Sequence, residues 1–380
     1  MVSVDLVRFS ASRVLPIICG LLFLVVERAP AGAVPMWRQV VSGMPPSRTS
    51  ASMAYDSARG KTLLYGGADS SFHIMGDTWE WDGFVWKRVA TTGIPARGYA
   101  SMAFDSARGK AVLFGGSDYS INYSDTSEWD GTVWRRVANG TPSARFFTCM
   151  AFDSARSKAV LFGGGFGETW EWDGTRWTRP ATTGPSARQG ASMAYDSVRG
   201  RTVLFGGISS GTRLRDTWEW DGSTWTPVAT TGPAARENAS MVYDTARSRA
   251  VLFGGWDGNS DLGDTWEWDG NTWQQTGTSG PPPRSEATMA YDSARQRVVL
   301  AGGWDNGTNH FADTWEYGSF HVSTVQDIAS ALQIAAGLIA PDADAMANLD
   351  VEKSGPSAGR VDIADVVRIA RKVAGLESNP

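Results

Sequence analysis

The sequence predicts an all-β fold of six repeated sheets, followed by a small helical segment. The first observation is the heptapeptide DTWEWDG at residues 77–83, which returns in closely related form in the next four units and, truncated to DTWEY, at residues 313–317. The second is a pair of glycines upstream of each copy, whose first members are spaced by 49, 48, 43, 48 and 48 residues. A period of this size built from short strands is typical of a β-propeller, because helical repeats would show a 3.6-residue period instead.

Each unit divides into four strands. In the first unit we expect them at residues 51–55, 62–65, 78–81 and 85–90, with a DSARG turn after the first strand and an Asp-Gly turn after the third. Asp-Gly between two strands is a strong hairpin signal, because both residues tolerate positive φ. Every unit is therefore expected to form one four-stranded blade.

The amino-terminal strand is predicted to close the ring. The sixth unit stops at Tyr317 and lacks the fourth-strand Trp of the other units. The segment MWRQVVSGMPPSR at residues 36–48 matches the fourth strand and linker found elsewhere, as in TWTPVATTGPAAR at residues 224–236. We expect it to complete the last blade, which gives six blades and leaves no open sheet edge.

Two residues recur in every unit with charges that need partners. Alternation along the third strand places Glu80 on the face opposite Trp79 and Trp81, and radially packed blades bury both faces. We expect each repeated glutamate to pair with the arginine that precedes the first strand of its unit, as scaffold. The glutamates are Glu80, Glu128, Glu171, Glu219, Glu267 and Glu316, and the arginines are Arg48, Arg97, Arg145, Arg188, Arg236 and Arg284.

The glycine pairs and the Trp downstream of each make residues 36 to about 317 resemble the kelch-repeat family, in particular bacterial kelch-like propellers of the galactose-oxidase type. The resemblance implies a propeller that binds protein or carbohydrate, or, in a minority, an oxidase. An oxidase of this type implies copper held by His and Tyr with a Cys-modified Tyr. The chain has three His residues, and Cys149 takes a small scaffold position on a first strand, so no copper is expected.

Any ligand is expected on one face of the ring. Antiparallel strands place alternate loops on opposite faces, and only the loops between second and third strands and the two residues after each repeated Arg vary between units. The proposed aromatic anchors are Tyr99, Tyr119, Tyr123, Phe147, Trp256 and Trp304, and the polar partners are Asp257, Asn259, Asp305, Asn306 and His310. Such a set suits a sugar ring and a protein partner almost equally, and solvated loops without a ligand are the alternative.

Two further classes of function find little support in the sequence. A net charge of −5 without a basic block argues against a nucleic-acid partner. A hydrolase is unsupported, because no carboxylate pair is distinguishable among 40 acidic residues. A D-x-N-x-D pattern at Asp257, Asn259 and Asp261 is the alternative reading of one variable loop as a calcium site, although no acid stands at its twelfth position.

The first 33 residues predict a cleaved secretory signal, and hence a secreted or extracellular-surface protein. Arg8 and Arg13 precede an apolar run at residues 14–26, and Ala-Gly-Ala at residues 31–33 supplies a cleavage site. The apolar run is too short to span a bilayer comfortably, so no membrane span is expected after cleavage. An uncleaved amino-terminal anchor is the alternative.

Residues 320–380 are predicted to be helical. Ile328 and Leu332 begin one apolar helical pattern, Val366 and Ile369 begin a second, and the two align at an offset of 38 residues. The duplication resembles a type I dockerin domain, a pair of half EF-hands, which implies calcium-dependent docking to a cohesin-like partner. The calcium ligands carried over from the resemblance are Asp350, Glu352, Ser354, Asp362 and Asp365. The first half lacks an acidic run, so at most one calcium site is expected; a helix pair with no partner is the alternative.

The sequence thus predicts a signal at residues 1–33, a six-bladed kelch-like propeller at 34–319 and a dockerin-like domain at 320–380. The expected function is non-catalytic recognition or adhesion through the variable loop face. The alternative is a carbohydrate-active enzyme, a glycoside hydrolase or a galactose-oxidase-like protein, tethered through the dockerin-like domain.

Overall fold

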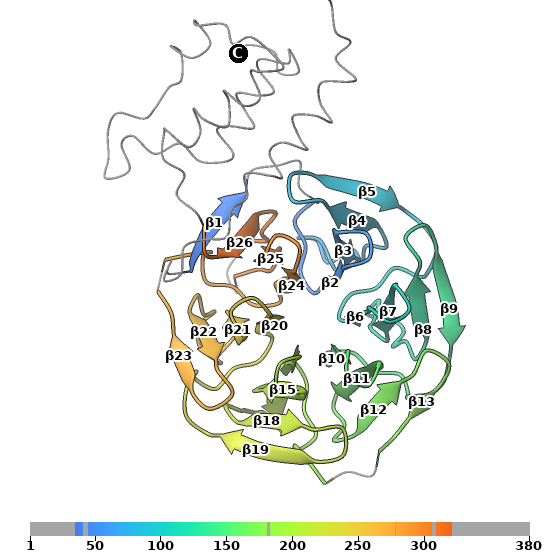
Figure 1. Cartoon of the computed structure of the whole chain (residues 1–380). Helices are drawn as coiled ribbons and strands as arrows, with labels where there is room; N and C mark the ends of the chain where they lie inside the picture. The colour runs from blue at the N-terminus through green and yellow to red at the C-terminus, as the bar shows by residue number, and fades with distance from the viewer. Residues whose placement is uncertain (1–34, 41–44, 181–182, 278, 306–308, 321–380) are drawn as a thin grey trace, which may run out of the picture. The chain divides into compact units, whose positions relative to one another are not determined.

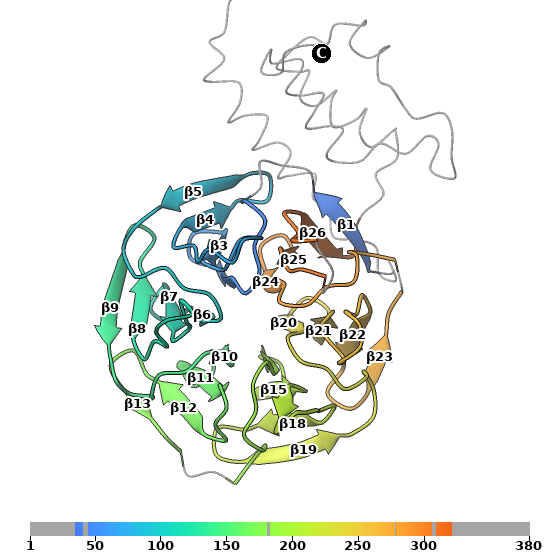
Figure 2. The same cartoon turned by 180° about the vertical axis from the view of Figure 1, so that it is seen from behind.

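The computed structural model describes residues 35–40, 45–180, 183–277, 279–305 and 309–320. Residues Met36–Gly318 form one unit, in which six four-stranded antiparallel sheets are arranged in a ring (Figure 1). Figure 2 shows the same ring from behind. The prediction of a six-bladed, all-β propeller is confirmed, and the described residues contain no helix.

The strands of each blade run outward from the centre in sequence order, apart from the one supplied by the amino terminus. The blades are β2 (Ser52–Asp56), β3 (Lys61–Tyr65), β4 (Thr78–Trp81) and β5 (Trp86–Ala90); β6 (Ser101–Asp105), β7 (Lys110–Phe114), β8 (Thr126–Trp129) and β9 (Trp134–Ala138); β10 (Thr148–Asp153), β11 (Lys158–Gly163), β12 (Thr169–Trp172) and β13 (Trp177–Thr178); β14 (Ser192–Asp196), β15 (Arg201–Phe205), β18 (Thr217–Trp220) and β19 (Trp225–Ala229); β20 (Ser240–Asp244), β21 (Arg249–Phe253), β22 (Thr265–Trp268) and β23 (Trp273–Gln275); and β24 (Thr288–Asp292), β25 (Arg297–Ala301), β26 (Thr314–Gly318) and β1 (Met36–Val40). In the fourth blade, β16 (Ile208–Ser209) and β17 (Thr212–Arg213) form a small hairpin in the loop between its second and third strands.

Several predictions concern residues outside this description. They are the secretory signal, the helical pair within residues 321–380, and the calcium ligands Asp350, Glu352, Ser354, Asp362 and Asp365. In the part of the chain that the structure describes, no helix has the length and apolar character needed to cross a membrane.

The hydrophobic core lies between neighbouring blades. Each cluster of buried residues draws on two adjacent sheets; in one of them Phe162 of β11 packs with Leu204 of β15 and Trp220 of β18. Cys149 belongs to this cluster, and burial raises the pKa of its thiol to about 12. It is therefore a packing residue with an inert thiol, as its scaffold position suggests.

The repeated arginine of each unit is buried and holds its blade together. The Arg48 guanidinium donates to the Gly66 carbonyl at 3.0 Å and to the Asp77 carboxylate at 2.8 Å. Four further blades repeat the arginine–aspartate pair and the bond to the glycine carbonyl, while in the third blade the acid is Glu168 and the guanidinium lies over the Phe166 ring.

The predicted partner of the repeated glutamates is wrong. Glu80 pairs with Arg59, in the turn after the first strand, at 2.8 Å, and the same pairing recurs in all six blades. The reason is the register: Glu80 lies opposite Leu63, near the start of β3 and thus near that turn. Arg48 lies at the other end of the strands, where Asp77 meets it.

Closure of the ring by β1 is confirmed. β1 pairs with β26 over five residues, from Met36 opposite Gly318 to Val40 opposite Thr314. The Trp37 indole donates to the Thr265 hydroxyl of the preceding blade at 2.8 Å. The outer-strand Trp residues of the other five blades make the same bond, with Nε1 to Oγ1 distances between 2.7 and 2.9 Å. Trp37 therefore occupies the position that the sixth unit lacks.

We predict that Trp37→Ala destabilises the full chain by about 3–5 kcal/mol, since it empties a buried aromatic site at the closure. Trp37→Phe should cost about 1 kcal/mol, because it chiefly leaves the Thr265 hydroxyl without its donor. Urea unfolding measures both, and Gln39→Ala, which changes an exposed residue of the same strand, is the control. Equal stability of Trp37→Ala and Gln39→Ala would contradict closure by β1.

Candidate functional site

Six residues form a closed ring of hydrogen bonds around the central axis. Each is the second residue after a repeated arginine, and each backbone N–H donates to the carbonyl of its counterpart in the neighbouring blade, at N to O distances of 2.8–3.1 Å. All six have φ between 53° and 60°. The ring consists of Ser50, Tyr99, Phe147, Gly190, Asn238 and Glu286.

The ring is uniform in backbone and individual in side chains. A positive φ at a non-glycine residue costs on the order of 1 kcal/mol, and five of the six positions carry that cost. The strain persists because ring closure fixes the backbone whichever side chain is present. The ring therefore holds six different side chains on a backbone of fixed conformation. Backbone strain of this kind is typical of functional positions.

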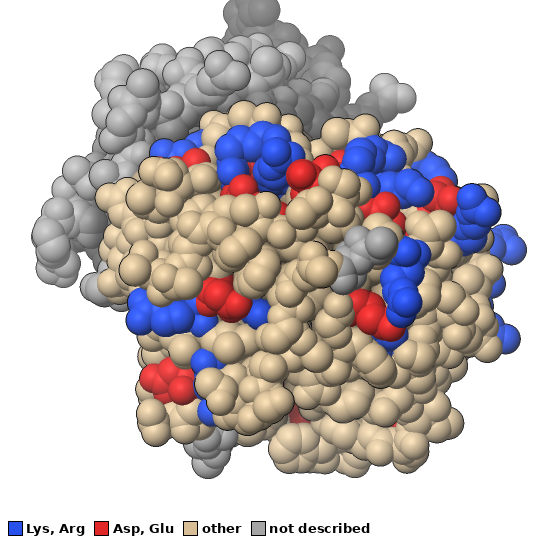
Figure 3. All heavy atoms as spheres, turned by 90° about the horizontal axis from the view of Figure 1, so that it is seen from below, with Lys and Arg blue, Asp and Glu red and all other residues tan. Residues whose placement is uncertain are grey.

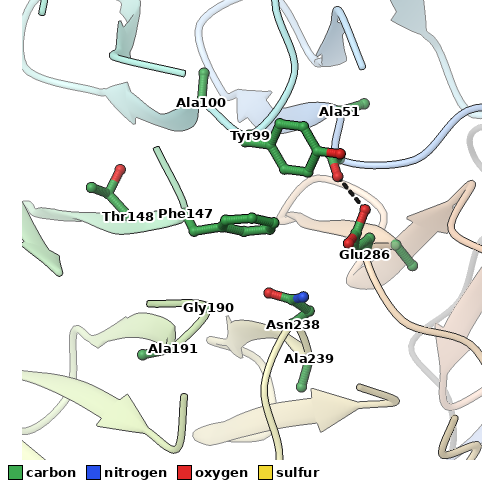
Figure 4. A pocket seen from close by; sticks show the side chains of 12 residues that line it. Ala51, Tyr99, Ala100, Phe147, Thr148, Gly190, Ala191, Asn238, Ala239 and Glu286 are labelled. Carbon is green, nitrogen blue, oxygen red and sulfur yellow. Dashed lines mark hydrogen bonds between the residues drawn. The ribbon is translucent and has the colours of Figure 1, made fainter. Parts of the chain in front are cut away.

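A hollow of about 130 Å³ lies at the ring. Figure 4 shows the side chains of Tyr99, Phe147, Asn238 and Glu286 directed into it. Its remaining lining is mostly small, with Ala51, Ala100, Thr148, Ala191, Ala239 and Ala287 following the ring residues in sequence. The small residues leave room, so the ring side chains decide what the hollow can hold.

One wall of the hollow is aromatic. The Tyr99 and Phe147 rings have centroids 4.5 Å apart, and Phe146 lies 5.4 Å from Phe147. The Tyr99 hydroxyl lies 3.0 Å from that of Tyr119, which extends the aromatic surface outward. Burial and the nearby charge of Glu286 raise the pKa of the Tyr99 hydroxyl, so this wall is neutral.

The opposite wall is acidic. The Ser50 hydroxyl donates to the Glu286 carboxylate, which is the bond dashed in Figure 4. Burial raises the pKa of Glu286, hydroxyl groups of Ser50 and Thr49 oppose that rise, and the charges of Asp261 and Glu237 add to it. Within the described part of the chain, no cationic group is among the strongest influences on this carboxyl group.

Only two of the predicted ligand-binding residues, Tyr99 and Phe147, lie in the hollow. Tyr119 lies beside it. Tyr123 is part of the scaffold instead: the Arg97 guanidinium lies 3.8 Å from its ring centroid, and its hydroxyl donates to Asp118 at 2.7 Å.

The remaining predicted residues lie in the loops around the ring. The backbone of Trp256 bridges to Glu237 and Asp261, and the Asp257 carboxylate accepts the Asn259 and Ser260 N–H groups at 2.7 and 2.8 Å.

In the last blade, the ring centroid of Trp304 lies 5.6 Å from that of His310. Asp305 accepts from the Asn309 N–H at 2.8 Å, and Asn306 lies outside the described residues. These outer residues stay predicted contacts at the rim.

Three residues of the hollow, Ser50, Asn238 and Glu286, were not predicted as site residues. Their signal was present in the sequence, since each belongs to the variable pair after a repeated arginine. Equal offsets in six blades place the second member of each pair on the axis. The first member lies farther out, where Thr49 pairs with Ala68 of the loop between the second and third strands.

Charged side chains are mixed on the outside of the ring. On the side seen in Figure 3, basic and acidic residues alternate near one edge, and much of the remaining surface is uncharged. That side offers no continuous basic surface.

Comparisons with known proteins support the propeller fold. Residues 169–322, less than half of the chain, match the model of the KLHDC2/KLHL20/DRC7 Kelch-repeats domain. No curated protein matches the chain. Of the many similar solved structures, that of YjhT has a TM-score of 0.59 and 15% sequence identity, and the match covers 71% of this chain and 95% of that one. At this identity the likeness concerns the fold alone.

These findings show the fold of a six-bladed β-propeller, in which residues 169–322 are similar to a kelch-repeat domain.

We predict that Glu286→Gln stabilises the protein at neutral pH. A carboxyl group with a raised folded-state pKa binds more protons when folded than when unfolded, so the folding stability falls as pH rises above the unfolded pKa of about 4.3. Removing the charge should raise Tm at pH 7, and the gain should vanish near pH 3. The control Glu316→Gln, which removes the partner of Arg295, should lower Tm at pH 7. A lower Tm for Glu286→Gln would contradict the argument.

Proposed function

We propose that this protein is a non-catalytic recognition protein that binds a partner protein on the variable loop face, with one group of the partner entering the central hollow. The observation that carries the proposal is the hydrogen-bonded ring, whose backbone is the same in six blades and whose side chains all differ. A scaffold requirement would select the same side chain each time. Side chains that vary on a backbone of constant conformation are typical of a recognition surface.

The kind of partner is argued from the surface and the class of protein. Kelch propellers generally bind proteins, and the match to a kelch-repeat model covers the last part of the ring. The aromatic side chains near the axis are of the types that dominate the binding energy of protein interfaces. The hollow is close in volume to an engineered cavity of about 150 Å³ that binds benzene, so it favours one side chain over an oligosaccharide.

Two sequence-based predictions extend this proposal. The signal-like residues 1–33 would direct the protein out of the cell, and the dockerin-like segment would attach it to a cohesin-like partner through one calcium ion. In this proposal the propeller recognises a target and the carboxy-terminal segment anchors it. The enzymatic alternative has no specific observation in its favour.

We predict that peptides selected from a random display library against the full chain bind at the hollow. Phe147→Ala and Tyr99→Ala should each weaken a selected peptide at least tenfold, about 1.4 kcal/mol, as expected for aromatic residues at the centre of an interface. The control is Val198→Ala, an exposed side chain in a turn of the opposite, uniform face. Affinity measured by fluorescence anisotropy should be unchanged in that control. If neither aromatic substitution changes the affinity for the selected peptides, the proposed binding surface is wrong.

We predict that the full chain binds about one calcium ion in a calorimetric titration, through the loop at residues 350–365. The double substitution Asp350→Asn with Asp365→Asn removes two of the predicted ligands and should abolish the heat of binding. Asp257→Asn tests the rival calcium loop in the propeller and should leave the titration unchanged. Absence of saturable binding in the unmodified chain would remove calcium-dependent docking from the proposal.

A further inference from the structure

The hollow combines a partly buried carboxyl group with an aromatic wall. Among the six ring positions, Glu286 carries the only carboxyl side chain, and the other blades place Ser, Tyr, Phe, Gly and Asn there. The scaffold therefore needs no carboxylate at this position. A partly buried carboxyl group that the fold does not need points to a ligand as its explanation.

The acidic groups of the scaffold show how this chain normally treats buried carboxylates. Asp77 receives two hydrogen bonds from Arg48, and Asp264 receives two from Arg236. Near the hollow, Glu237 pairs with Arg213 at 2.7 Å. Glu286 instead contacts the Ser50 hydroxyl, and the charges of Glu237 and Asp261 act on it with the same sign. Among the described residues, Glu286 thus lacks the arginine partner that the scaffold acids have, and its carboxylate attracts a cation rather than an anion.

The aromatic wall favours the same kind of ligand. Phe147 stands across the hollow from the carboxylate, and the Tyr99 ring, tilted by 58° to it, reaches with its hydroxyl toward Glu286 (Figure 4). The faces of such rings attract ammonium and guanidinium groups and also pack against an aliphatic stem. A hollow of about 130 Å³ has room for the end of one long side chain.

We propose that the hollow receives a lysine or arginine side chain of the partner protein, whose charged end pairs with Glu286 while Tyr99 and Phe147 flank it. This rests on the proposed function, because it assumes a protein on the variable face, and it adds the chemistry that selects the partner. Asn238 supplies a further acceptor beside the entering group.

The charge requirement is tested on the full chain with small probes. Calorimetry should show n-butylammonium and ethylguanidinium binding at least tenfold more tightly than the uncharged 1-butanol. Glu286→Gln should abolish that preference, and this variant keeps its fold because the substitution removes an unfavourable charge. Asp221→Asn, which removes one exposed carboxylate from the opposite face, should retain it. Equal binding of cation and alcohol by the unmodified chain would overturn the proposal.

The source of the cation is tested with the display-selected peptides. The selected sequences should share one Lys or Arg, and its replacement by norleucine should weaken binding at least thirtyfold in the unmodified chain but less than threefold in Glu286→Gln. If the selected peptides require Phe147 for binding but contain no basic residue that matters, the proposed basic side chain is wrong and the proposed function stands. If free n-butylammonium binds as tightly as every selected peptide, the hollow is a site for a small amine. The proposal that it receives a side chain of a partner protein is then wrong.

Discussion

The buried arginine at the start of each repeat is the interaction on which the rest of the propeller depends. Its guanidinium binds within its own blade, to the first glycine carbonyl and to the acid before the third strand. Its backbone carbonyl accepts the N–H of the second glycine of the preceding blade, as Arg97 does from Gly67 at 3.0 Å. A Cβ at Gly66 would stand 2.3 Å from that same carbonyl, so the glycine pair is required by the junction between blades.

The junction also places the functional surface. In five of the six blades the residue after the arginine pairs with the loop between the second and third strands, and in every blade the next residue joins the axial ring. The buried ion pairs of the arginines, two residues before the ring positions, thus fix where the side chains at the axis lie. Because the ring bonds use only backbone atoms, the side chains can vary without loss of closure. A rigid, invariant frame that presents variable groups is an economical way to build a recognition site on a repeat fold.

The repeats made the blades, the closing strand and the variable face predictable, because each was visible six times at a fixed offset. The partners of the repeated glutamates were not, since two arginines recur at equivalent positions of every repeat and only the strand register decides between Arg48 and Arg59 for Glu80. The hydrogen-bonded ring was missed for a related reason. It joins residues of neighbouring units through closure in space, which no local pattern of a single unit reveals. The burial of Glu286 follows only from that closure.

Glu286 shows where the demands of the frame and of the site differ. In the frame, the repeated glutamates and the acids before the third strands meet arginines, which offsets their desolvation. At the axis the Glu286 carboxylate accepts from the Ser50 hydroxyl and lies near other acids, and its removal from solvent raises its pKa. A frame held by twelve arginine–carboxylate pairs tolerates one such unfavourable group. The missing counter-charge is then the feature that a binding partner supplies.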